Sequence, residues 1–122
     1  MYEDDFEEER EAFDQDKIIC VSSSYERKFY LADKFSGLPE QIKEELQIMC
    51  VLFTEDVGGI LTMVYDDEGN ISFLVTTAAG DFAFDEIGSE YKIRQIQRQK
   101  KDFLESLEKY IRVKFMGENI DY

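Results

Sequence analysis

The chain has 122 residues, a formal net charge of −14 and a sequence pI of about 4.3. Its length predicts a single domain over residues 1–122, and an aromatic content of 14% supplies the large apolar groups that a disordered chain lacks. The negative charge argues against nucleic-acid and anionic-lipid partners, and no stretch approaches the roughly 20 apolar residues of a membrane span. The acidic start, Met1 to Asp5, is unlike a signal peptide. We therefore expect a cytoplasmic protein with no nucleic-acid and no membrane partner.

Residues 2–15 have the pattern of an acidic helix. Tyr2, Phe6 and Phe13 lie four and seven residues apart and make a narrow apolar stripe. Within residues 1–16, nine acids stand against Arg10 alone, which gives a local charge of −8. The acids lack the spacing of a known calcium loop. We therefore expect a solvated acidic face here and no metal site.

Two β-hairpins are predicted, at residues 17–32 and 60–76. In the first, Lys17 to Ser24 reads as a strand with an apolar run at 18–21, the serines at 22–24 start a turn, and a second strand follows at 27–32. No partner base accompanies the serines, so we interpret them as a polar turn. In the second, the turn at 66–70 separates two strand-like runs. This turn fails as an EF-hand loop, because Val75 stands where that motif needs glutamate.

A helix is predicted at 39–54, between the two hairpins. Pro39 suits a first helical position, and Gly58-Gly59 suits a helix end. The main buried face carries apolar residues at spacings of four, three and four: Ile42, Leu46, Met49 and Phe53. Residues 48–53 are apolar all round, so the helix should need cover on several sides. We expect the stretch 44–76 to form the middle of the core.

The last long element is predicted as a helix at 89–110, about 33 Å long, with Asp85 or Ser89 as its N-cap. Residues 81–84 could add a marginal fifth strand before it, and residues 111–116 read as a terminal strand or as the helix end. Residues 117–122 should be a loose tail. Heptad spacing relates Ile93, Ile96, Lys100, Phe103, Leu107 and Tyr110. At Lys100, either its stem covers apolar surface or the stripe leaves the core there.

The sequence is poor in groups that carry chemistry. It has no histidine, which removes the commonest general base and zinc ligand. Cys20 and Cys50 both lie in apolar runs, so we expect two buried, reduced thiols. We accordingly predict no catalytic residue, no cofactor and no metal.

Two stretches, EREAFDQDKIICVSSSYERKFYL and LQIMCVLFTEDVGG, resemble an uncharacterised family of short acidic proteins from anaerobic Gram-positive bacteria. The resemblance runs from end to end, and it implies a bacterial, intracellular protein of no assigned activity. In element order alone, the chain also resembles roadblock or profilin-like α+β modules, which is an analogy of architecture and not of function.

The predicted fold is α+β, with a four- or five-stranded, mainly antiparallel sheet packed with helices in the order α-β-β-α-β-β-(β)-α. The predicted core combines the inward faces of these elements: Ile18, Cys20, Phe29, Leu31, Ile42, Leu46, Met49, Cys50, Phe53, Leu61, Met63, Phe73, Val75, Ile96, Phe103 and Leu107.

A non-catalytic interaction or regulatory module is the function that the sequence favours, with a possible protein partner. We expect a homodimer, because a small sheet should leave part of the long C-terminal helix uncovered. Its predicted interface is the heptad stripe: Ile96, Phe103, Leu107 and Tyr110. The alternative is a small carboxylate-dependent enzyme using Glu55 and Asp56. A third class, nucleic-acid binding through the basic segment 91–114, is opposed by the overall charge, although eight bases and three acids give that segment +5.

Overall fold

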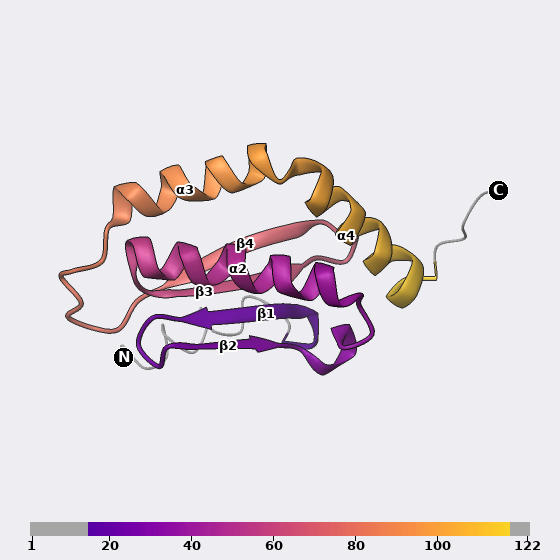
Figure 1. Ribbon diagram of the computed structural model, residues 1–122, viewed down its shortest axis with the longest axis horizontal. Coiled ribbons are helices and arrows are strands. Elements are labelled where there is room, and N and C mark those ends of the chain that lie inside the picture. The colour runs from indigo at the N-terminus through magenta and orange to yellow at the C-terminus, as the bar shows by residue number, and fades with distance from the viewer. Residues whose placement is uncertain (1–14, 118–122) are drawn as a thin grey trace.

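The computed structural model describes residues 15–117, and these form an α+β fold, as predicted (Figure 1). The predicted helix at 2–15, apart from Gln15, and all of the predicted tail except Gly117 lie outside the described residues. The elements, in chain order, are η1 Gln15–Lys17, β1 Ile18–Ser23, β2 Lys28–Leu31, η2 Asp33–Phe35, α2 Glu40–Val57, β3 Ile60–Tyr65, β4 Ile71–Thr76, α3 Glu86–Gln99 and α4 Lys101–Phe115.

The four strands form one antiparallel sheet in the order β2-β1-β3-β4. Both predicted hairpins are present, and the central contact joins β1 of the first hairpin to β3 of the second. The optional fifth strand is absent, because residues 81–84 form turns. The register places Cys20 beside Leu31 and Met63, and Ser22 beside Phe29 and Leu61. These residues point to one face of the sheet, and α2 packs on that face.

Hydrogen bonds to Asp66 organise the turn between β3 and β4. Its carboxylate accepts the backbone N–H groups of Glu68 and Asn70, each at 2.9 Å. These bonds stabilise the charged form and lower the pKa of Asp66. Gly69 completes the turn with a φ of 84°, a conformation that favours glycine. The acids of this loop therefore close a hairpin, as the sequence indicates.

Helix α2 starts and ends close to the predicted residues. Pro39 occupies the N-cap position, whereas we expected it at the first helical position, so the helix starts at Glu40. At the other end the Gly58 N–H donates to the Thr54 carbonyl at 2.9 Å, and Gly58 and Gly59 have φ values of 87° and 76°. The two glycines thus let the chain leave the helix and enter β3 directly. Figure 1 shows α2 lying against the sheet, with α3 alongside it.

The predicted single helix at 89–110 is wrong, because the chain bends at Lys100. Asp85 caps the start of α3 by accepting the Gly88 N–H at 2.8 Å, and α3 ends at Gln99. Lys100 has a φ of −106° and a ψ of 24°, and its ammonium contacts the Glu45 carboxylate of α2 at 3.1 Å. Helix α4 then continues to Phe115, so residues 111–115 are helical. Beyond the bend, α4 packs on the core, to which it contributes Leu104, Leu107 and Ile111.

The core lies between the sheet and the helices, and most of the predicted members belong to it. Ile18 is the exception, because a β-bulge between Ile18 and Cys20 changes which side chains point inward, and Ile19 is fully buried instead. The expectation also missed other buried residues: Phe35, Leu38, Val57, Val64, Tyr65, Leu104 and Ile111. Phe35 and Leu38 lie in a connection, where no period applies, and Leu104 and Ile111 lie in α4, each directly after a residue of the heptad stripe.

An aromatic cluster closes the end of the core near η2. The ring of the fully buried Phe35 lies 6.2 Å from Tyr65, 6.3 Å from Tyr110 and 5.2 Å from Phe115, measured between centroids. Edge-on pairs at such distances are favourable beyond their buried area. Lys34 covers the cluster with its ammonium 4.7 Å from the Phe115 ring centroid and donates to the Tyr65 hydroxyl at 2.6 Å. The short η2 segment is thereby tied to α4.

Candidate interaction site

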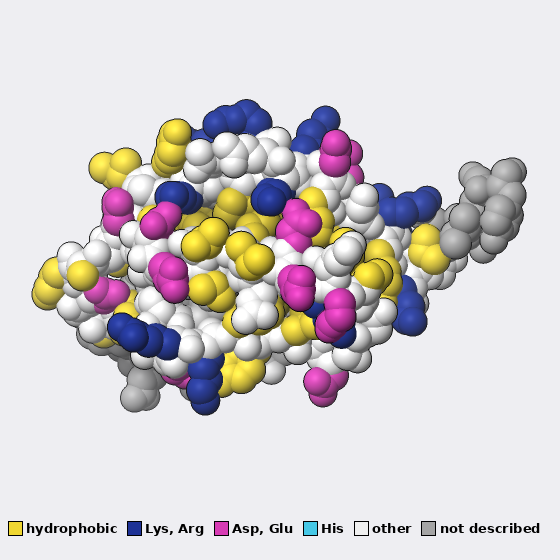
Figure 2. Space-filling model, viewed as in Figure 1, with side chains coloured by type: hydrophobic (Ala, Val, Ile, Leu, Met, Phe, Trp, Pro, Cys, Tyr) yellow, Lys and Arg dark blue, Asp and Glu magenta, His cyan; other side chains and the backbone are white. Residues whose placement is uncertain are grey.

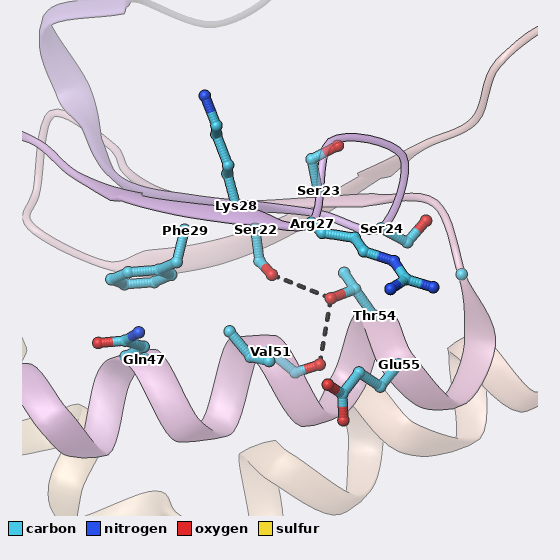
Figure 3. Close-up of a pocket in the computed structure, with 11 residues that line it drawn as sticks. Ser22, Ser23, Ser24, Arg27, Lys28, Phe29, Gln47, Val51, Thr54 and Glu55 are labelled. Atoms are coloured by element: carbon cyan, nitrogen blue, oxygen red, sulfur yellow. Dashed lines mark hydrogen bonds between the residues drawn. The ribbon is translucent and has the colours of Figure 1, made fainter.

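A cleft of about 690 Å³ opens between the first hairpin and α2. Figure 3 shows its walls, with β1 and β2 on one side and the C-terminal half of α2 on the other. The size is in the range of ligand-sized clefts. Its lining comes from three segments: Ser22, Ser23 and Ser24; Arg27, Lys28 and Phe29; and Gln47, Val51, Thr54, Glu55 and Gly58.

Two buried hydroxyl groups form the floor of the cleft. Ser22 Oγ and Thr54 Oγ1 lie 2.9 Å apart, and Thr54 also donates to the Val51 carbonyl at 3.1 Å (Figure 3). Either hydroxyl can be the donor in the bond between them. The partner of Ser22 Oγ is thus a neutral hydroxyl, and a nucleophilic serine needs a base beside it. The predicted polar turn is wrong for Ser22 and Ser23, which are buried residues of β1, and only Ser24 lies in the turn.

Three consecutive residues of the first hairpin, 27–29, border the cleft. Arg27 has a φ of 54°, which turns the chain into β2, and its guanidinium extends from the hairpin toward the α2 side (Figure 3). Lys28 points away from the helix, to the other side of the sheet (Figure 3). Phe29 points into the cleft, over Gln47 (Figure 3). Apolar and charged groups therefore border one open depression.

The outer side of α2 continues this surface. Ile48 and Leu52 are 59% and 56% exposed, one helical turn apart. Glu44 lies one turn before Ile48, and Glu55 lies almost one turn after Leu52, so the four residues share a side of the helix. We call these four residues the α2 face. Figure 2 shows apolar side chains in the centre of this view, with acidic side chains on both sides of them.

The carboxylates of the α2 face have no cationic partner within residues 15–117. The ion pairs of α2 use other acids: Glu40 with Lys43, Glu45 with Lys100 and Asp56 with Lys92. Glu44 and Glu55 are both exposed. The α2 face thus offers an apolar centre between two carboxylates, a combination typical of surfaces that contact other proteins.

The acid/base pair of the enzyme alternative is not assembled. Glu55 lines the cleft, whereas the Asp56 carboxylate lies 2.5 Å from the Lys92 ammonium of α3. The two side chains lie on different surfaces of α2, one at the cleft and one against α3, so they do not converge on a common point. No group of three or more His, Cys, Asp or Glu side chains in the described part of the chain could hold a metal ion.

The residues of the predicted interface pack against the protein's own core. Leu107 is only 3% exposed, and Ile96, Phe103 and Tyr110 are half-buried neighbours of the core cluster. Tyr110 belongs to the aromatic cluster around Phe35. The stripe of α4 follows the bend at Lys100 and packs on the core cluster.

Sequence reasoning did not single out Ile48 and Leu52. It noted that residues 48–53 are apolar all round and expected cover on several sides of the helix. In the described residues that cover reaches Met49, Cys50 and Phe53, and it leaves the α2 face open. Apolar residues outside the buried stripe were the available signal.

The two cysteines are buried and free, and their sulfur atoms lie 3.8 Å apart. The hydrogen bond with Cys50, together with burial, raises the pKa of the Cys20 thiol well above its ordinary value. A protonated, enclosed thiol is a poor nucleophile. The expectation that both cysteines are buried is confirmed.

In the described part of the chain, no helix combines the length and the apolar composition that crossing a membrane requires.

The comparisons with known proteins give a family and no activity. Neither the curated proteins nor the solved structures include a match to this chain. A family model described as a family of unknown function, DUF6145, matches residues 16–119. The resemblance to an uncharacterised family is thereby confirmed, and the chain belongs to DUF6145.

Proposed function

We propose that this chain is a non-catalytic protein-interaction module that binds a cationic, amphipathic segment of another protein on the α2 face. The observation that carries the proposal is the exposure of Ile48 and Leu52, at 59% and 56%, beside an open cleft. Two large aliphatic side chains one turn apart lose apolar exposure when a partner covers them, at roughly 25 cal/mol per Å². Leu52 follows Val51, which lines the cleft, so the exposed apolar surface lies next to the cleft.

The charge around the apolar pair selects the partner. Helix α2 carries five acids, Glu40, Glu44, Glu45, Glu55 and Asp56, against Lys43 alone, so its net charge is −4. Three of the acids are engaged by lysines, which leaves Glu44 and Glu55 without a cation among residues 15–117, at the two ends of the apolar pair. A partner with leucine-like residues flanked by Lys or Arg matches this order. Such complementarity contributes specificity and association rate more than affinity.

An intracellular place of action is part of the same proposal. The sulfur atoms of the free Cys20 and Cys50 lie 3.8 Å apart. In an oxidising compartment, two thiols this close could form a disulfide. Both cysteines belong to the apolar core with their thiols free. Trapping thiols with a mass-shifting reagent in intact cells should find both cysteines reduced. A disulfide between them in cells would place the protein elsewhere.

Calorimetric titration with a designed helical peptide of leucine and lysine tests the function. Wild type should bind it more tightly than a peptide of serine and lysine with equal charge, because only the former covers the apolar pair. Ile48→Ser should remove most of that difference. Ile87→Ser is the matched control, since Ile87 is 84% exposed on α3, and it should bind like wild type. Equal binding of both peptides, or equal loss in both variants, would refute the proposal.

A further inference from the structure

The outer edge of β2 carries backbone groups without a strand partner in the part of the chain that the structure describes. β2 is the first strand of the order β2-β1-β3-β4. The Ala32 N–H donates to the Ile19 carbonyl at 2.9 Å, so these two residues form a hydrogen-bonded pair. Such pairs alternate along antiparallel strands, so Tyr30 and Lys28 also bond inward to β1. The N–H and C=O groups of Phe29 and Leu31 therefore point outward.

We propose that this edge pairs with β2 of a second copy of the chain, antiparallel, about a two-fold axis at Tyr30. In that register Phe29 of each copy lies opposite Leu31 of the other. The outward groups of both residues then form hydrogen-bonded pairs on each side of the axis. A shift of one pair in either direction uses Arg27, whose φ is 54°, or Asp33, which lies in η2, and both leave the extended conformation that pairing needs. The chosen register is thus the one that uses every outward group of the strand.

The charges at the strand ends agree with the same register. Arg27 precedes β2, and in the pairing it meets Asp33 of the second copy. Neither residue has an ion-pair partner among residues 15–117, and both are exposed. The two-fold axis creates this contact twice. Opposite charges at the ends of paired strands favour the register, even in a chain of net charge −14.

The helices leave room for the second copy. Helix α2 packs mainly over β1, one strand in from the edge. With strands about 4.8 Å apart, the two α2 axes would lie about 14 Å from each other, which exceeds the roughly 8–10 Å of packed helices. The perpendicular two-fold axis keeps both α2 helices on the same side of the joined sheet. The two clefts then border one shared groove, floored at its centre by Phe29 and Leu31 of both copies.

This self-association differs from the dimer that the sequence suggests through Phe103, Leu107 and Tyr110, whose side chains pack on their own core. It also does not depend on the proposed partner of the α2 face. A monomeric chain could still bind the leucine and lysine peptide, and a dimer could form without binding it. The two proposals therefore fail separately.

Light scattering on the full chain over a concentration series tests the pairing. Wild type should approach twice its 14.4 kDa mass as concentration rises. Tyr30→Glu should abolish the dimer, because it places two carboxylates opposite each other at the axis. Tyr30 is 50% exposed, so the folded monomer should accept the change. Tyr91→Glu is the matched control on α3, where Tyr91 is 57% exposed, and it should dimerise like wild type.

A cysteine at the axis provides a second readout that survives a weak dimer. In the proposed register Tyr30 lies opposite itself in a non-hydrogen-bonded pair, with Cα atoms about 4.5 Å apart, which suits a disulfide. Tyr30→Cys should give a disulfide-linked dimer on mild oxidation, and Tyr91→Cys should not. The proposal is overturned if wild type stays monomeric and the Tyr30→Cys variant forms no cross-link, or if a dimer persists in Tyr30→Glu.

Discussion

Ser22 on β1 and Thr54 on α2 share a 2.9 Å hydrogen bond between hydroxyl groups that are only 1% and 4% exposed as residues. The bond joins the first hairpin to the helix at the floor of the cleft. Both hydroxyls have apolar neighbours: Leu61 lies beside Ser22 in the sheet, and Phe53 precedes Thr54 in the helix. The position of the hairpin against α2 therefore depends on a polar pair that is satisfied internally.

Removal of both hydroxyls should destabilise the fold by less than the sum of the two single removals. Thr54→Val keeps the shape and leaves the buried Ser22 hydroxyl without its hydrogen-bond partner, which should cost about 1–3 kcal/mol of unfolding free energy. The double variant Ser22→Ala with Thr54→Val should lose less than the sum of the single losses. Urea unfolding of the wild type, Ser22→Ala, Thr54→Val and the double variant measures the coupling between the two hydroxyls. Strict additivity would show that the hydroxyls do not depend on one another.

The two cysteines should react slowly in the native protein. The Cys20 thiol holds its proton more tightly than usual, because the hydrogen bond with Cys50 and burial both raise its pKa. Labelling with a thiol reagent should accelerate when denaturant exposes both groups, since the thiolate is the reactive form. The colour yield over time in native buffer and in denaturant gives the comparison. Fast native labelling would indicate an activated thiol and would favour an enzymatic role.

The same thiol should make stability fall in alkaline solution. The folded-state pKa of Cys20 is raised above its ordinary value of 9.0, so the folded chain keeps a proton that the unfolded chain releases. The stabilising contribution is complete below about pH 9 and is lost as pH rises toward the folded-state pKa, by up to about 1.4 kcal/mol per pH unit. Urea unfolding from about pH 8 to pH 10 should show a shallower decline for Cys20→Ala. Equal slopes would mean that this thiol is not the cause.

Phe35 should be among the most sensitive positions of the core. It is fully buried at the centre of the aromatic cluster, so Phe35→Ala should cost about 3–5 kcal/mol of unfolding free energy. Phe82→Ala is the control, because Phe82 is 97% exposed, and it should change stability by about 0.5 kcal/mol or less. Chemical unfolding compares the two. Similar losses would mean that Phe35 does not anchor the end of the core.

Duplex DNA and RNA should not bind at physiological salt. Four bases of the segment 91–114 are already paired with carboxylates, namely Lys92, Arg94, Lys100 and Lys101, and the whole chain repels a polyanion at −14. Fluorescence anisotropy with a labelled duplex should stay flat across a protein titration. Binding that weakens steeply with added salt would reveal an independent basic patch.

Local patterns were sufficient for much of the fold. Apolar, strand-like runs separated by turn residues marked both hairpins, and the spacing of Ile42, Leu46, Met49 and Phe53 placed α2 and its buried face. The bend at Lys100 was not predictable, because heptad spacing continues through it, and the contact that accompanies it, with Glu45, is long-range. Phe35 was missed for a related reason, since a short connecting segment has no period. The bulge before Cys20 moved Ile19 inward and reversed a strand-period inference.

The candidate site was harder to predict than the fold. The apolar excess of α2 was visible in the sequence, but which side stays open depends on where α3 and the sheet pack. Ile48 and Leu52 differ from buried Met49 and Phe53 only in their angle around the helix. The open edge of β2 depends on strand order, which Phe29 and Leu31 do not encode by themselves.

Charge reversal on the α2 face tests the central claim most directly. Glu44→Lys with Glu55→Lys should lose the leucine and lysine peptide and gain binding to a leucine and glutamate peptide, as measured by calorimetry. Glu86→Lys with Asp102→Lys changes the net charge equally at exposed positions elsewhere and should keep the preference of wild type. If both double variants reverse preference alike, overall charge governs binding, and the α2 face is not the interaction site.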